Sequence, residues 1–144
     1  MQPPLEPCFR GAAAWIPTVV AVAAGVVFVS FGLGKFTDHA SETVDFRRYE
    51  VPLASLAVWV AGVVELGGGL LLLLGLFVRP AAAVLAGQMV AVVATAGRVE
   101  GGFLNLGIAP TLFVAMVFLV WAGAGALSLD RLLVSPGRAR GRTS

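Results

Sequence analysis

The sequence predicts an all-α integral membrane protein, built as a four-helix antiparallel bundle. Of its 144 residues, 58% are hydrophobic and only 12% are charged, whereas soluble domains carry about 25% charged residues. The mean hydropathy is +0.92. The apolar residues fall into four long runs, separated by short charged or glycine-containing stretches. This is the pattern of a multi-pass membrane protein.

The first two runs, residues 13–33 and 53–77, are each long enough to cross a bilayer. A helix rises about 1.5 Å per residue, so about 20 apolar residues span a hydrocarbon core about 30 Å thick. Helices are the expected spanning form, because hydrocarbon cannot satisfy an open backbone. The first run is too long for the apolar part of a secretory signal, so we expect it to stay in the protein as a helix.

The third and fourth runs complete the bundle. Residues 81–97 are dominated by Ala, Val and Gly and are only just long enough to span, whereas residues 108–129 span comfortably. We therefore predict one transmembrane domain, residues 13–130. An N-terminal tail of residues 1–12 and a basic C-terminal tail of residues 131–144 flank it.

Each connection has its own character. Val78-Arg79-Pro80 predicts a tight hairpin between the second and third helices, because proline is tolerated in the first turn of a helix. Residues 98–106 join the last two helices. Residues 35–51 form the longest connection, in which charged and apolar side chains alternate. A short segment lying on the membrane surface is expected there.

Basic residues predict the orientation. The side that carries both tails and the Arg79 hairpin holds six Lys and Arg residues, and the opposite side holds four. This bias places both termini in the cytoplasm, with the protein in the inner (plasma) membrane and the long first connection outside. The net charge of +2 therefore reflects topology and does not indicate binding to nucleic acid.

Glu65 is the most informative residue, since it is the only charge between residues 52 and 77. It falls near the bilayer midplane, where a charge costs at least about 2.5–3.5 kcal/mol. Its carboxyl must therefore be protonated, paired, or turned toward a protein or water-filled interior. Glu65 is the first candidate for a ligand or proton site.

Gln88 is the expected companion of Glu65 in the third helix. Glu65 precedes the hairpin arginine by 14 residues and Gln88 follows it by 9, so their depths differ by about 7 Å. A hydrogen bond between them would act as a polar clasp between two helices. The functional alternative is a site for a polar head group, such as that of a quinone, or a proton-handling carboxyl.

Lys35 closes the first helix on the outer side, where we expect its side chain to snorkel to the lipid head groups. The alternative is that it reaches down to Glu65. Glu65 lies 12 residues inside the outer end of its helix, at a depth of about 18 Å, which is far for one lysine.

The other polar residues suggest no catalytic centre. Arg79 and Asp130 both fall on the inner surface, where they are candidates for an ion pair. His39 is the only histidine and is expected to be a solvated loop residue, and Cys8, the only cysteine, has no partner for a disulfide. We identify no metal site, no catalytic residue and no intrinsic cofactor in the sequence.

Three stretches resemble the DoxX family of small bacterial four-helix membrane proteins. The central one is the most specific: a glutamate followed by glycines, a leucine-rich run and an arginine hairpin. One difference is that relatives often carry a histidine near the end of the third helix, where this chain has residues 95–98. The three stretches are residues 28–36 (FVSFGLGKF), 62–80 (GVVELGGGLLLLLGLFVRP) and 123–130 (GAGALSLD).

The resemblance implies a membrane subunit or partner of an oxidoreductase complex, not catalytic alone, possibly with quinone as a ligand. It equally allows a non-enzymatic anchor or assembly factor for partner proteins. A small-molecule transporter is less favoured, because four helices leave little room for a gated pathway in a monomer. We therefore expect partners in the lipid bilayer, either other proteins or further copies of the chain.

Overall fold

The structure, a computed structural model, describes residues 9–126 and Leu129. Four helical stretches are long and apolar enough to cross a membrane, and no strand occurs in this part of the chain. The predicted all-α membrane architecture is therefore confirmed. The four spans are Gly11–Thr37, Ala54–Leu74, Val78–Val99 and Leu104–Ala122.

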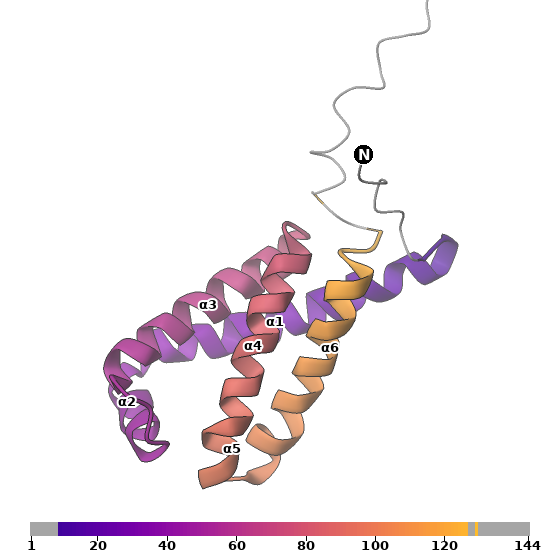
Figure 1. The fold of residues 1–144 in the computed structure, drawn as a ribbon. Helices are drawn as coiled ribbons and strands as arrows, with labels where there is room; N and C mark the ends of the chain where they lie inside the picture. Colours follow the sequence, from indigo (N-terminus) through magenta and orange to yellow (C-terminus); the bar gives the residue numbers. More distant parts are fainter. Residues whose placement is uncertain (1–8, 127–128, 130–144) are drawn as a thin grey trace, which may run out of the picture.

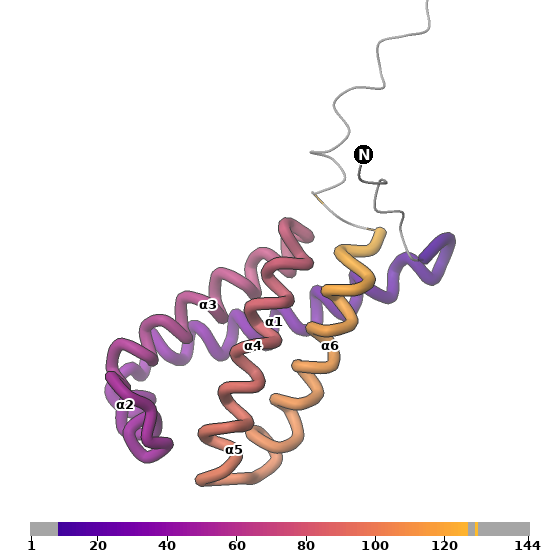
Figure 2. The backbone as a smooth tube through the Cα atoms, viewed as in Figure 1, coloured from indigo at the N-terminus to yellow at the C-terminus, as the bar shows by residue number. Residues whose placement is uncertain are grey.

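The spans associate as two antiparallel pairs. Helix α1 (Trp15–Thr37) packs along α3 (Ala54–Leu74), and α4 (Val78–Ala94) packs along α6 (Ala109–Ala122). In Figure 1 the first pair runs across the view and the second runs down it, so that the pairs cross. The backbone trace in Figure 2 shows α3 and α4 meeting at their hairpin and diverging away from it.

Short elements complete the chain. The 3₁₀ turn η1 precedes α1, α5 prolongs the third span, and a π-helical turn, η2, opens the fourth. The long connection contains α2, which packs against α3 at the end of the molecule opposite the N-terminus. The surface segment expected there is thus a helix. The bounds are Gly11–Ala14 for η1, His39–Arg48 for α2, Ala96–Val99 for α5 and Leu104–Ile108 for η2.

Glycines allow α1 and α3 to approach closely. A Cβ atom on Gly32 of α1 would lie 2.7 Å from the backbone nitrogen of Leu66, and one on Gly69 of α3 would lie 2.9 Å from the backbone nitrogen of Val29. Small residues are how membrane helices gain packing contacts in place of a hydrophobic driving force. These contacts also fix the register of the two helices.

The core lies where the two pairs cross. Phe28 of α1, Leu85 of α4 and Met116 of α6 are completely buried there. Many large apolar side chains point outward instead, including Val63 of α3 and Val114 of α6. Outward-facing aliphatic side chains are expected where acyl chains, not water, cover the protein.

Several predicted helix boundaries were wrong, most clearly at the hairpin and at the end of the fourth span. The third helix begins at Val78, because Gly75 and Phe77 adopt positive φ angles of 64° and 46° and make the turn themselves. Pro80 nevertheless lies in the first turn, as expected. The fourth helix ends at Ala122 and does not continue to residue 129, because Gly123 has a φ of 78° that breaks the helix.

The segment after α6 folds back onto the start of α1. The backbone N–H of Ala126 donates to the carbonyl oxygen of Ala14 at 2.9 Å and to Thr18 Oγ1 at 3.0 Å. A Cβ atom on Gly125 would lie 2.6 Å from the same threonine oxygen. Glycine at this position is therefore required for the contact that fastens the fourth span to the first.

Candidate functional site

Glu65 lies in the middle of α3, with its side chain only 4% exposed. Lys35 Nζ of α1 is 3.1 Å from Glu65 Oε2, and Gln88 Nε2 of α4 donates a hydrogen bond of 2.7 Å to Glu65 Oε1. Lys35 and Glu65 form an ion pair, but the angles at Glu65 Oε2 are not those of a hydrogen bond. Three helices thus meet at one carboxylate, and the carboxylate faces protein and not lipid.

The expectation that Lys35 snorkels to the head groups was wrong. Our depth estimate assumed that α1 and α3 end at the same level. In the structure, a Cβ atom on Gly62 would lie 3.2 Å from Lys35 Cβ, so the end of α1 is level with the middle of α3. Gly62 is one turn from Glu65, and the lysine needs only its own length to reach the carboxylate.

Glu42 of α2 extends this cluster toward the surface. Its Oε2 atom is 3.6 Å from Lys35 Nζ, and its side chain is 34% exposed, compared with 13% for Lys35. Exposure therefore falls stepwise from Glu42 through Lys35 to Glu65. A buried charge is tolerated only when it is paired and hydrogen-bonded, and these contacts meet that requirement for Glu65.

Gln88 connects the cluster to an apolar groove. Its side-chain oxygen Oε1 is buried and has no hydrogen-bond partner among the described residues. Gln88 also lines a groove of about 420 Å³ between α3 and α4. The rest of the lining is apolar and comes mostly from α3: Pro52, Leu53, Leu56, Ala57, Val60, Ala61 and Val64, with Val84 of α4.

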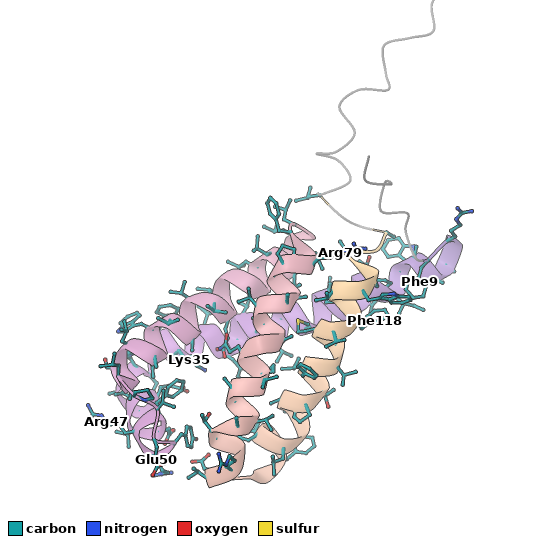
Figure 3. The ribbon with its side chains drawn as sticks, in the orientation of Figure 1. Phe9, Lys35, Arg47, Glu50, Arg79 and Phe118 are labelled. Carbon is teal, nitrogen blue, oxygen red and sulfur yellow. The ribbon has the colours of Figure 1, made fainter. Side chains whose placement is uncertain are left out.

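Arg79 has a structural role at the opposite end of the molecule from Arg47 and Glu50, as Figure 3 shows. Its Nη2 atom donates to the carbonyl oxygen of Trp121 at 3.2 Å, where the last turn of α6 leaves carbonyl groups without helical partners. The predicted ion pair with Asp130 lies outside the described residues.

His39 is not the solvated loop residue that we expected. It begins α2, its Nε2 atom is 3.1 Å from Ser55 Oγ, and its ring lies 4.6 Å from that of Trp59. Its position follows from helix α2, which turns the predicted loop back onto α3. The spacing of the charged residues in this connection did not predict the contacts of His39 with Ser55 and Trp59.

A second polar contact that the sequence analysis missed joins α2 to the connection between the last two spans. Arg48, at the end of α2, donates to Glu100 Oε1 at 3.1 Å. Burial, and then a hydrogen bond with Glu100, raise the pKa of Tyr49 above its usual range. The hydrogen bond with Tyr49 lowers the pKa of Glu100. Glu100 is the only acidic residue between the last two spans, and this was the one feature of the sequence that could have indicated the contact.

Within the part of the chain that the structure describes, no three His, Cys, Asp or Glu side chains gather to hold a metal ion. The structure does bring together Lys35, Glu65 and Gln88, which the sequence singled out. Their role as a ligand or proton site stays a prediction.

Comparisons with known proteins agree with this architecture. Residues 16–98, which include all three residues of the cluster, match the DoxX family. The chain is also 37% identical, over 134 residues, to the uncharacterized membrane protein Rv3486 of Mycobacterium tuberculosis, and the match covers 81% of this chain and 82% of that protein. No solved structure matches the chain. The family match and the long alignment with a membrane protein show that this chain is a member of the DoxX family.

Proposed function

We propose that the chain is a membrane-embedded subunit or partner of an oxidoreductase, and that it binds a quinone or quinol beside Glu65 and Gln88. One observation carries this proposal. The apolar groove between α3 and α4 is open to the side and includes Gln88 in its lining, and Gln88 is bonded to the buried carboxylate of Glu65.

The chemistry of the groove suits such a ligand. A quinol has an apolar ring and tail and two hydroxyl groups, and the groove offers aliphatic walls with one polar point. The unpartnered Oε1 atom of Gln88 is an acceptor for a quinol hydroxyl. Ligand pockets typically combine apolar lining with a few such polar groups.

The neighbouring charges supply a route for a proton. Oxidation of a quinol releases two electrons and two protons. In this proposal both electrons pass to a redox centre of the partner oxidoreductase, and the two protons pass one after the other to the carboxylate of Glu65, which gives up the first before it takes the second. Lys35 and Glu42 then connect that carboxylate to the surface on the α2 side.

Quinone binding to the purified protein in lipid nanodiscs tests the first part. Ala61→Phe fills the groove and is expected to weaken binding by about tenfold or more. Val63→Phe is the matched control, because Val63 lies on the same helix but is exposed and does not line the groove. Equal quinone affinity in the two variants would remove the groove from the proposal.

Electron transfer in native membranes tests the second part. Glu65→Gln keeps the shape of the side chain and removes its ability to take up a proton, so quinone-linked electron transfer should fall while the protein still accumulates. Glu50→Gln changes an exposed carboxylate that does not line the groove and should have no effect. Normal electron transfer with Glu65→Gln would contradict the proposed role.

A docking platform for partner proteins is the second candidate function, because α2 is an ordered helix with an exposed face. Ser41 and Val44 are both exposed on it. Val44→Asp should then reduce the recovery of a co-purifying protein without changing quinone binding. Unchanged recovery would count against this alternative.

A further inference from the structure

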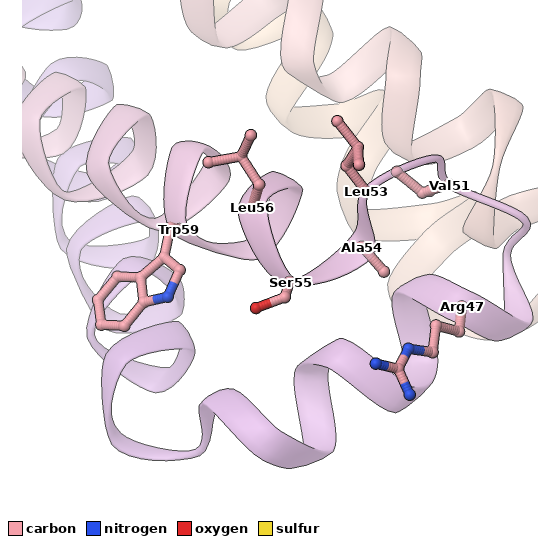
Figure 4. Close-up of a pocket in the computed structure, with 7 residues that line it drawn as sticks. All are labelled: Arg47, Val51, Leu53, Ala54, Ser55, Leu56 and Trp59. Atoms are coloured by element: carbon pink, nitrogen blue, oxygen red, sulfur yellow. The ribbon is translucent and has the colours of Figure 1, made fainter.

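A second groove, of about 640 Å³, opens between α2 and the first turns of α3. It shares Leu53 and Leu56 with the groove at Gln88, but its polar side chains are different and include neither Glu65 nor Gln88. Figure 4 shows that Arg47 enters it from α2, whereas Ser55, Leu56 and Trp59 come from α3. Val51 and Leu53, from the turn between these helices, add apolar surface.

The polar side chains that line this groove belong to Arg47, Ser55 and Trp59, and each of them can donate a hydrogen bond. The guanidinium of Arg47 and the indole N–H of Trp59 can only donate. No carboxylate lines the groove, so nothing there repels an anion. The apolar lining of Leu53 and Leu56 lies beside these donors.

The hydroxyl of Ser55 can donate to a ligand when His39 carries its proton on Nε2. Thr43 Oγ1 donates its hydrogen to the carbonyl oxygen of His39 at 2.7 Å, and its contact of 3.4 Å with His39 Nε2 is compatible with the tautomer that carries the proton on Nε2. The same N–H then points to Ser55 Oγ at 3.1 Å. Because Ser55 accepts from His39, its own hydrogen remains available to a ligand.

Arg47 differs from Arg48 because its guanidinium forms no salt bridge with the described residues. Arg48 pairs with Asp45 and Glu100, whereas no acidic side chain in the described part of the chain pairs with Arg47. Arg47 is exposed. An arginine of this kind, beside two further donors, is suited to bind a phosphate group.

We propose that this groove binds an anionic phospholipid from the leaflet on the α2 side. The phosphate contacts Arg47 and Ser55, and one acyl chain lies on Leu53 and Leu56. The depth is suitable, because the span of α3 begins at Ala54 and Trp59 follows within two turns, in the zone where tryptophan borders the head groups. Free phosphate would satisfy the donors and leave the apolar half of the groove uncovered.

Lipid retention by the purified full-length protein tests this assignment. Native mass spectrometry after exchange into vesicles of phosphatidylglycerol and phosphatidylcholine, with matched acyl chains, measures the preference between the two lipids. The wild-type protein should retain phosphatidylglycerol preferentially. Arg47→Gln should lower that retention by about fivefold, the usual contribution of one basic residue at a membrane surface.

Arg98→Gln is the matched control, since Arg98 is exposed at the end of α5 and does not line the groove. It should retain phosphatidylglycerol like the wild-type protein. Ser55→Ala, which removes one donor and no charge, should weaken retention less than Arg47→Gln does.

Three outcomes would overturn the proposal. The first is equal retention of the two lipids by the wild-type protein. The second is an equal loss of phosphatidylglycerol in the Arg47 and Arg98 variants, which would indicate a general charge effect. The third is displacement of the lipid by inorganic phosphate at millimolar concentration, which would show that the acyl chain contributes nothing.

Discussion

Replacing Lys35 by methionine should destabilise the protein by about 3 kcal/mol. Lys35 Nζ is 3.1 Å from Glu65 Oε2, and at an effective dielectric constant of about 20 this separation corresponds to an attraction of about 5 kcal/mol. Removing one partner of a buried pair usually costs about 3–5 kcal/mol. The hydrogen bond from Gln88 remains, which places the expected loss at the lower end.

The two single variants should differ, because the two charges have different surroundings. Glu65→Gln leaves Lys35 with Glu42 at 3.6 Å and with partial exposure, so its expected cost is only about 1–2 kcal/mol. Lys35→Met leaves the Glu65 carboxylate without a paired countercharge among the described residues, and only the neutral Gln88 amide still contacts it. The double variant removes both charges and should lie within about 1 kcal/mol of the wild-type protein.

Reversible unfolding in mixed detergent and SDS micelles, followed by circular dichroism, measures all four proteins. The ion-pair coupling between the two substitutions should therefore be about 3–5 kcal/mol. It would be refuted if Lys35→Met were as stable as the wild-type protein. It would be refuted equally if adding Glu65→Gln failed to restore any of the stability lost by Lys35→Met.

Three further predictions follow from contacts elsewhere. Gly32→Val should cost about 1–3 kcal/mol, because its Cβ would meet backbone of α3, whereas Gly34→Ala has open space and should be tolerated in the same unfolding assay. Tyr49 is the only tyrosine, so tyrosinate absorbance during an alkaline titration should show it deprotonating above the usual pKa of about 10. Because the pKa of Tyr49 is raised in the folded protein, the neutral tyrosine stabilises the fold below pH about 10. This contribution is lost as the pH rises through the pKa of the folded protein. Glu100→Gln should lower the titration midpoint, and an unchanged midpoint would show that burial alone is responsible. Gly125→Ala, at a φ of 74°, should detach the end of the fourth span and expose residues 123–126 to faster amide exchange than in the wild-type protein.

Glu65 and Gln88 could be found from the sequence because depth in a membrane is nearly proportional to position along a helix. Glu65 is the one charge in its span, and Gln88 lies at a similar distance on the other side of a short hairpin. A tight turn leaves little freedom in how two helices are staggered, so counting residues placed the two side chains at similar depths and made a hydrogen bond between them one of the alternatives. The observed hydrogen bond of 2.7 Å agrees with that estimate.

Lys35 could not be assigned in this way, because the stagger between α1 and α3 is not set by a short turn. Sixteen residues lie between Thr37 and Ala54, and α2 takes up most of them. The stagger is instead set by glycine contacts such as that of Gly32 with Leu66. The sequence displayed the glycines but not which residues they face.

Hydropathy and the spacing of charges were sufficient to establish the membrane location, the number of spans and the buried carboxylate, since each depends on the transfer of individual residues from water to hydrocarbon. The partners of that carboxylate, the bonds of His39 and the donor-lined groove at Arg47 depend on how helices cross and on where a connecting helix lies. Those features arise from close contacts between residues distant in the chain, and no local pattern specifies them.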